Sequence, residues 1–158
     1  MKRIALLFIS VLLISVANAQ GSCDKPTFHF SGKIYPTMYQ GSFRGFNTGL
    51  EAGYGNFALS VLGGKVFETD ESAGFHRFEL QPRAYTSVNG DGIFAAFSYM
   101  MYNNGENSAG GMLGFKFNLA DIMSAEVFGG IQKNTTFESD WSDIEFRTRF
   151  GAGLVFGF

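Results

Sequence analysis

Two residues near the start of the chain have side chains that could together perform hydrolysis. His29 and Ser31 are two positions apart, so in an extended strand both side chains point to the same face. A serine hydroxyl beside a histidine and a carboxylate is the arrangement that produces a nucleophile for acyl transfer. So short a spacing also arises readily by chance. We therefore keep hydrolysis by His29 and Ser31 as an alternative and do not expect an enzyme.

A second group of residues with chemical potential consists of charges that share one face of the predicted strands. The acidic and basic members can pair with one another away from bulk water, and Arg147 is expected to pair with Glu79 or Glu126. The slight excess of basic residues favours one alternative, a polar conduit or a site for a small anion. The members of this predicted charge network are Lys33, Glu51, Arg77, Glu79, Arg83, Lys116, Glu126, Glu145, Arg147 and Arg149.

Strands must position these residues, because apolar side chains recur at every second position through most of the chain. The clearest example is 144–158, where Phe150 and Leu154 alternate with Arg149 and Gly153. A tilted strand needs about 9–11 residues to cross a bilayer, and the predicted segments are close to that length. The sequence therefore predicts an all-β domain at 28–158, an eight-stranded antiparallel up-and-down transmembrane barrel. Its strands are expected at 28–34, 46–54, 57–64, 77–85, 93–101, 111–118, 125–132 and 144–158.

The predicted connections between these strands alternate in kind. Those at 55–56, 86–92 and 118–123 are compact, and those at 36–44, 68–74, 103–108 and 134–143 are longer. The last three spans contain acids and no Lys or Arg: Glu68, Asp70, Glu71, Glu106, Glu138, Asp140 and Asp143. Short turns at one end and longer loops at the other are typical of membrane barrels. None of these loops has the spacing of a calcium-binding loop, so we expect no metal and no cofactor.

The first 19 residues have the features of an export signal. A basic start is followed by an apolar run at 4–16, and Ala17 and Ala19 then provide small residues before Gln20. This pattern predicts cleavage before Gln20, since a spanning helix needs about 20 apolar residues. Residues 20–27 are then expected to form a periplasmic tail.

Composition excludes several classes of protein. With 158 residues the chain suffices for one domain, and 46% hydrophobic residues with 19 Phe exclude disorder. A single cysteine, Cys23, excludes a disulfide scaffold, and 12 Lys and Arg against 14 Asp and Glu give no support for nucleic-acid binding. Charged residues make up only 16%, against about 25% in soluble domains. Part of the surface is therefore expected to face something other than water.

Alternation alone does not tell which face of the sheet lies inside. One alternative is a membrane barrel with its apolar face in lipid; the other is a soluble periplasmic, lipocalin-like barrel that binds an apolar ligand. The lumen of eight strands is only wide enough for side chains, and the charged face is rich in glycine, which would hydrate an exterior poorly. Aromatic residues recur near strand ends, where membrane interfaces favour them: Tyr35, Tyr54, Phe57, Tyr85, Tyr99, Tyr102, Phe117 and Phe158. These features favour the membrane barrel.

At this point the chain resembles the small bacterial outer-membrane β-barrels of the OmpA/OmpX type. The resemblance covers the whole mature chain as a pattern, but only the final strand, which ends in Phe156-Gly157-Phe158, as a motif. It implies location in the outer membrane of a Gram-negative bacterium and recognition by the barrel-assembly machinery. Phe150, Leu154, Phe156 and Phe158 would form the assembly signal. His29 and Ser31 resemble the His-x-Ser pair of some lipid A hydrolases.

The sequence thus predicts an integral outer-membrane barrel with a structural or interaction role. Paired charges close its lumen, and acidic loops face outward toward an extracellular partner that the sequence does not identify. Outer-membrane lipid and the assembly machinery are the expected partners, with no nucleic acid. Eight strands leave too little room for a diffusion pore.

Overall fold

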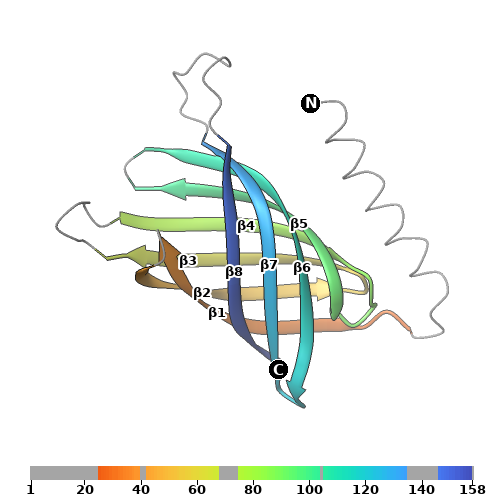
Figure 1. Cartoon of the computed structure of the whole chain (residues 1–158). Coiled ribbons are helices and arrows are strands. Elements are labelled where there is room, and N and C mark those ends of the chain that lie inside the picture. The colour runs from red at the N-terminus through yellow and green to blue at the C-terminus, as the bar shows by residue number, and fades with distance from the viewer. Residues whose placement is uncertain (1–24, 40–41, 68–74, 104, 135–145, 158) are drawn as a thin grey trace, which may run out of the picture.

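The computed structural model describes residues 25–39, 42–67, 75–103, 105–134 and 146–157. It confirms the prediction of an all-β, eight-stranded, closed antiparallel barrel in which each strand pairs with the next and β8 pairs with β1 (Figure 1). The strands are β1 (Phe28–Tyr39), β2 (Ser42–Tyr54), β3 (Phe57–Val66), β4 (Phe75–Tyr85), β5 (Gly92–Tyr102), β6 (Asn107–Ala120), β7 (Met123–Asn134) and β8 (Phe146–Gly157). Within this part of the chain, no helix has the length and apolar character to cross a membrane.

The two ends of the barrel differ in how the strands are connected. We call the end with the connections at 55–56, 86–91 and 121–122 the turn end, and the opposite end the loop end. At the turn end Gly55 has a positive φ of 58°, a conformation that glycine adopts without steric cost. The two-residue connection between β2 and β3 therefore begins with the residue type that its backbone requires.

Four predicted connections are shorter than expected. Most of 36–44 belongs to β1 and β2, which continue to Tyr39 and from Ser42, and the connections predicted at 86–92, 103–108 and 118–123 also lose residues to strands. Pro36 has no N–H to donate to the ladder. It is tolerated in β1 because pairing with β8 covers only Ser31 to Ile34 and ends before Pro36. The predicted loop at 68–74 lies outside the described residues, as does the predicted loop at 134–143 except for Asn134, which ends β7.

Neighbouring strands are displaced along one another, and the displacements add up around the barrel. We follow the residue pairs from strand to strand, in the order β1 to β8. Starting at Phe28 on β1, they lead to Phe150 on β8. Extending the β1–β8 register places Phe150 level with Met38, ten positions beyond Phe28. A stagger of this kind accompanies strand tilts of about 35–45°.

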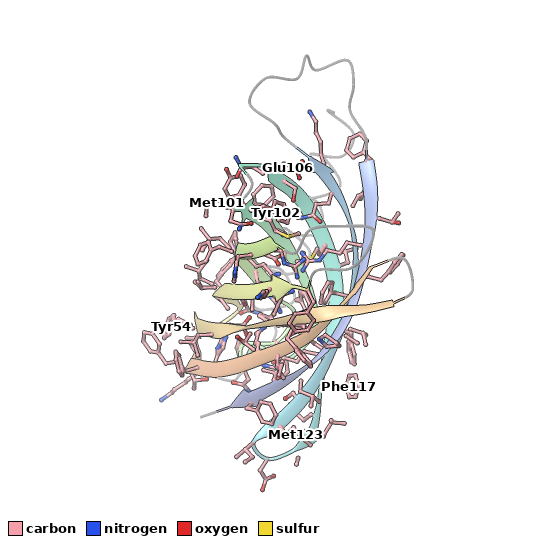
Figure 2. All side chains as sticks on the ribbon, turned by 90° about the vertical axis from the view of Figure 1, so that its left-hand side faces the viewer. Tyr54, Met101, Tyr102, Glu106, Phe117 and Met123 are labelled. Atoms are coloured by element: carbon pink, nitrogen blue, oxygen red, sulfur yellow. The ribbon has the colours of Figure 1, made fainter. Side chains whose placement is uncertain are left out.

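The apolar face of the sheet points outward and the charged face points inward. On β5, Phe97 is 50% exposed whereas its neighbour Ser98 is 1% exposed. On β2, Leu50 is 52% exposed and Glu51 is fully buried. Figure 2 shows the described side chains on both faces; Met101 and Tyr102 mark the loop end in this view, and Phe117 and Met123 mark the turn end.

The interior also contains aromatic rings, and some of them pack over a glycine on a neighbouring strand. Phe94 is fully buried and lies opposite Gly114, and Phe128 lies opposite Gly151. A Cβ at Gly114 would collide with the Phe94 ring and lie 2.7 Å from the carbonyl oxygen of Val127. These glycines leave room for the rings in a narrow lumen.

This packing predicts that Gly114→Ala destabilises the barrel by about 1–3 kcal/mol, because overpacking forces ring and backbone to shift. Gly63→Ala is the matched control, since a Cβ at this outward position meets nothing within 4 Å. It should change stability by no more than about 0.5 kcal/mol. The measurement is the free energy of urea unfolding of the refolded protein. Equal effects of the two substitutions would contradict the packing described.

Candidate functional site

The structure describes the side chains of eight residues of the predicted charge network, and all eight lie on the inward face of their strands. Six of them lie in the lumen around two carboxylate centres, and Arg77 and Lys116 lie at the edges of this network. Glu145 lies outside the described residues, and for Arg147 only the backbone is described. The eight are Lys33, Glu51, Arg77, Glu79, Arg83, Lys116, Glu126 and Arg149.

Glu126 on β7 is the centre of a cluster that joins opposite walls of the barrel. Arg83 on β4 donates from Nη1 to both carboxylate oxygens of Glu126 at 2.9 Å. Lys33 on β1 places Nζ 3.1 Å from Oε2, and the Tyr35 hydroxyl donates to Oε1 at 2.5 Å. The side chains of Lys33, Arg83 and Glu126 have no exposed surface. The charge of this carboxylate is therefore compensated entirely by protein groups.

Glu51 on β2 completes the same cluster. Its Oε2 lies 2.6 Å from Lys33 Nζ and accepts a hydrogen bond of 2.6 Å from the Ser60 hydroxyl. The Tyr85 hydroxyl lies 2.9 Å from both carboxylate oxygens. Two cations and two carboxylates thus balance, as buried charges require.

Glu79 is the centre of a second cluster, nearer the loop end. Arg149 on β8 binds its two oxygens with two nitrogens, at 2.5 and 2.9 Å, a bidentate geometry that is among the strongest ion-pair arrangements. Ser98 and Gln81 also donate to Glu79, at 2.6 and 2.5 Å. Gln81 accepts from Arg83 Nε at 3.0 Å, so the two clusters form one continuous network.

Two of the predicted members lie at the edges of this network. Arg77 donates from Nε to Asn47 Oδ1 at 3.1 Å. Lys116 pairs at 3.5 Å with Asp91 in the connection between β4 and β5, where the Asp91 side chain is 32% exposed. Lys116 therefore ties a turn to the barrel wall and is not part of either cluster.

His29 and Ser31 face the lumen near the turn end, and no hydrogen bond joins them. Both ring nitrogens of His29 and the Ser31 hydroxyl are buried without a hydrogen-bond partner among the described residues. Glu51 is level with Ser31 on β2, yet its oxygens are bound to Lys33, Ser60 and Tyr85. A nucleophile needs a hydrogen bond to its base, and this arrangement does not supply one.

Tyr35 and Tyr85 correct the predicted belt of interfacial aromatic residues. Both were expected at a membrane interface, but they are only 3% and 0% exposed, and their hydroxyls bind the central carboxylates. The sequence alone could have placed them inside. Tyr35 is two residues from Lys33 on β1, and Tyr85 is two residues from Arg83 on β4, so each tyrosine shares the inward face with a charged residue. Their position near predicted strand ends obscured this placement.

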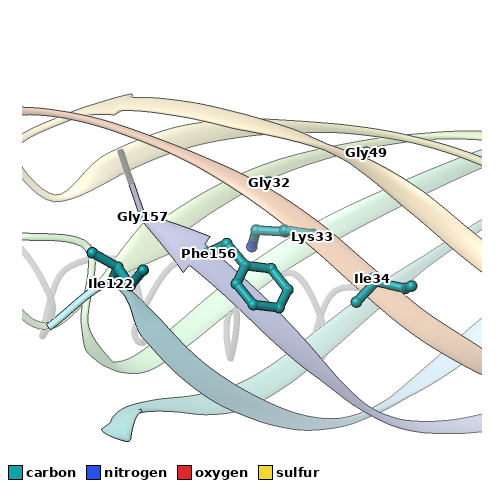
Figure 3. A pocket seen from close by; sticks show the side chains of 7 residues that line it. All are labelled: Gly32, Lys33, Ile34, Gly49, Ile122, Phe156 and Gly157. Atoms are coloured by element: carbon teal, nitrogen blue, oxygen red, sulfur yellow. The ribbon is translucent and has the colours of Figure 1, made fainter. Parts of the chain in front are cut away.

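The lumen holds the charge network together with buried apolar side chains, among them Leu62, Phe94 and Met112. A hollow does occur where β1 meets β8, lined mainly by Ile34, Ile122 and Phe156 beside glycines (Figure 3). It includes neither His29 nor Ser31. No group of three or more His, Cys, Asp or Glu side chains suited to a metal is found among the residues described.

Of the predicted assembly-signal residues, Phe150, Leu154 and Phe156 lie on the outward face of β8, at 79%, 39% and 37% exposure. Phe158 lies outside the described residues. Their common orientation agrees with the alternation read from the sequence.

Comparisons with protein-family models, with curated proteins and with solved structures find no match to the chain.

The network predicts strong coupling between Arg83 and Glu126. Either Arg83→Met or Glu126→Gln leaves buried charge without its partner, which costs about 3–5 kcal/mol of unfolding free energy. The double variant should cost less than the sum of the two single changes, by about 0.5–3 kcal/mol. Urea unfolding of all four proteins gives this coupling energy.

Lys116→Met is the matched control, because its partner Asp91 is partly exposed and such pairs contribute about 0–1 kcal/mol. Strict additivity of Arg83→Met and Glu126→Gln, or an equal loss for Lys116→Met, would contradict the central position of Glu126.

Proposed function

We propose that this protein is an integral outer-membrane β-barrel with a structural or interaction role, whose lumen is closed by the charge network. One observation carries the proposal: the polarity of the barrel is the reverse of that in water-soluble proteins. Soluble monomers rarely expose contiguous apolar patches of more than a few hundred Å². Here large apolar side chains cover the outward face of the strands, and the buried charges lie inside.

The outward side chains support the proposal strand by strand. Ile93 and Phe97 on β5 are 54% and 50% exposed, and Leu113 and Phe115 on β6 are 47% and 45% exposed. No outward strand position with a described side chain carries an acid. Such a surface is stable in lipid. In a closed barrel the backbone N–H and C=O groups of every strand are hydrogen-bonded to neighbouring strands, as the hydrocarbon region requires.

The closed lumen supports a role that does not depend on passage through the barrel. Tyr85, Phe94, Glu51, Glu79 and Glu126 fill its cross-section with no exposed surface. Binding to other molecules is therefore assigned to the ends and to the outer wall. The acidic loops expected from the sequence at the loop end are the candidates for contact with an extracellular partner.

Phe97→Arg tests the lipid environment, because Phe97 lies at the middle of β5. An arginine near the bilayer midplane costs about 2–4 kcal/mol, whereas one near the interface costs about 0–1 kcal/mol. Phe57→Arg is the matched control, since Phe57 is similarly exposed at 54% but lies beside the turn between β2 and β3. We expect a large loss of unfolding free energy in lipid vesicles for Phe97→Arg alone.

Localisation provides the second arm of this test. The full chain expressed in a Gram-negative host should sediment with the outer membrane on a sucrose gradient. Recovery in the soluble periplasmic fraction, together with equal stabilities of the two arginine variants, would overturn the proposal.

A further inference from the structure

The outward basic side chains that the structure describes all lie at one level of the barrel. Among outward positions with described side chains, the basic residues are Lys65 on β3, His76 on β4 and Lys133 on β7, all close to the loop end. Lys65 and His76 are paired in register on neighbouring strands. Lys133 is paired with Ala109 and Phe146, on another side of the barrel.

Lys65 and His76 are close enough to hold one anion between them. Directly opposed residues in an antiparallel pair have Cβ atoms about 4.5–5.5 Å apart. The end of β4 is fixed beside β5, because the His76 N–H donates to Asn103 Oδ1 at 3.1 Å and the Asn103 N–H donates to the His76 carbonyl at 3.2 Å. A phosphate between the two side chains would therefore meet a nitrogen donor on each strand.

Beneath this pair the outward face lacks one side chain, at Gly63 on β3, and we call this gap the notch. Gly63 is the next outward residue on β3, and it is paired with Thr48 and with Phe78. A Cβ at Gly63 would meet nothing within 4 Å, so the surface between Thr48 and Phe78 is open. Below the notch the wall is apolar, with Leu50 and Val61 52% and 36% exposed.

The order of these features along the barrel axis matches an amphiphile with an acidic head. Two basic side chains stand above an open notch, and apolar side chains continue below it. A phosphate would accept hydrogen bonds from the Lys65 ammonium and from the His76 imidazole. An attached acyl chain would lie in the notch and along the wall.

We propose that Lys65, His76 and the notch at Gly63 bind the phosphate-bearing headgroup of an anionic membrane lipid, with part of an acyl chain over Gly63. This proposal rests on the proposed membrane location of the barrel. It adds a preferred lipid class and a position on the outer wall.

Binding is measured with the full-length protein in dodecyl maltoside micelles, by native mass spectrometry of retained phosphatidylglycerol and phosphatidylcholine with identical acyl chains. The wild type should retain phosphatidylglycerol preferentially. Lys65→Gln should weaken that retention about fivefold, as expected for one basic side chain near an anionic lipid. Lys65→Arg should preserve it, and Lys65→Gln with His76→Gln should remove the preference.

Two further variants separate this site from general electrostatics. Lys25→Gln removes the same charge from an exposed residue just before β1, near the turn end, and should leave retention unchanged. Gly63→Leu fills the notch without changing any charge, and it should also weaken retention. Inorganic phosphate at millimolar concentration should not displace the lipid.

Equal losses for Lys65→Gln and Lys25→Gln, equal retention of both lipids by the wild type, or displacement by inorganic phosphate would overturn the inference. Failure of the membrane proposal looks different: the wild type would not insert into vesicles of either lipid. A barrel that inserts normally but shows no lipid preference contradicts the lipid site alone.

Discussion

A carboxylate buried inside a narrow barrel has to be compensated by partners that come from other strands, and this requirement organises the whole molecule. Glu126 on β7 is bound by Arg83 from β4 and by Lys33 from β1, so its partners cross the lumen. Because side chains alternate along each strand, placing these groups inside fixes the orientation of every neighbouring position. A slip of one residue in any strand would move its charges to the outer wall. The network therefore specifies the register and, with it, the apolar exterior.

The width of the lumen imposes a second constraint that acts with the first. Eight strands enclose only enough space for side chains, and here that space is shared between ion pairs and rings. Phe94 fits because Gly114 lies opposite it, and the Arg83 guanidinium lies 4.5 Å from the centre of the Phe94 ring, a cation–π contact. Polar and aromatic groups thus fill the same cross-section, which leaves the ends and the outer wall as the surfaces for binding.

The sequence was sufficient for the strands and for the two faces, because alternation is a local property. Leu50 and Glu51, or Phe97 and Ser98, are assigned to opposite faces by their parity alone. It was insufficient for the ion pairs, because partners across a lumen are set by stagger and tilt. Arg147 was expected to pair with Glu79 or Glu126, but its side chain lies outside the described part of the structure. The partner that the structure describes for Glu79 on β8 is Arg149. Tyr35 and Tyr85 were expected at the membrane interface because they are near the predicted strand ends. Alternation along the strand, which places both on the inner face, was the better guide.

The central claim is that the outward face of the barrel lies in lipid. It is tested most directly by depth-dependent quenching with brominated lipids, using Phe97→Trp and Phe57→Trp in a background where the single tryptophan, Trp141, is replaced by Phe. If the outward face lies in lipid, the indole of the Phe97→Trp variant should be quenched most strongly by bromines near the middle of the acyl chains. The indole of the Phe57→Trp variant should be quenched most strongly by bromines near the headgroups. Water-like emission from both variants, with no quenching by brominated lipids at any depth, would contradict the claim.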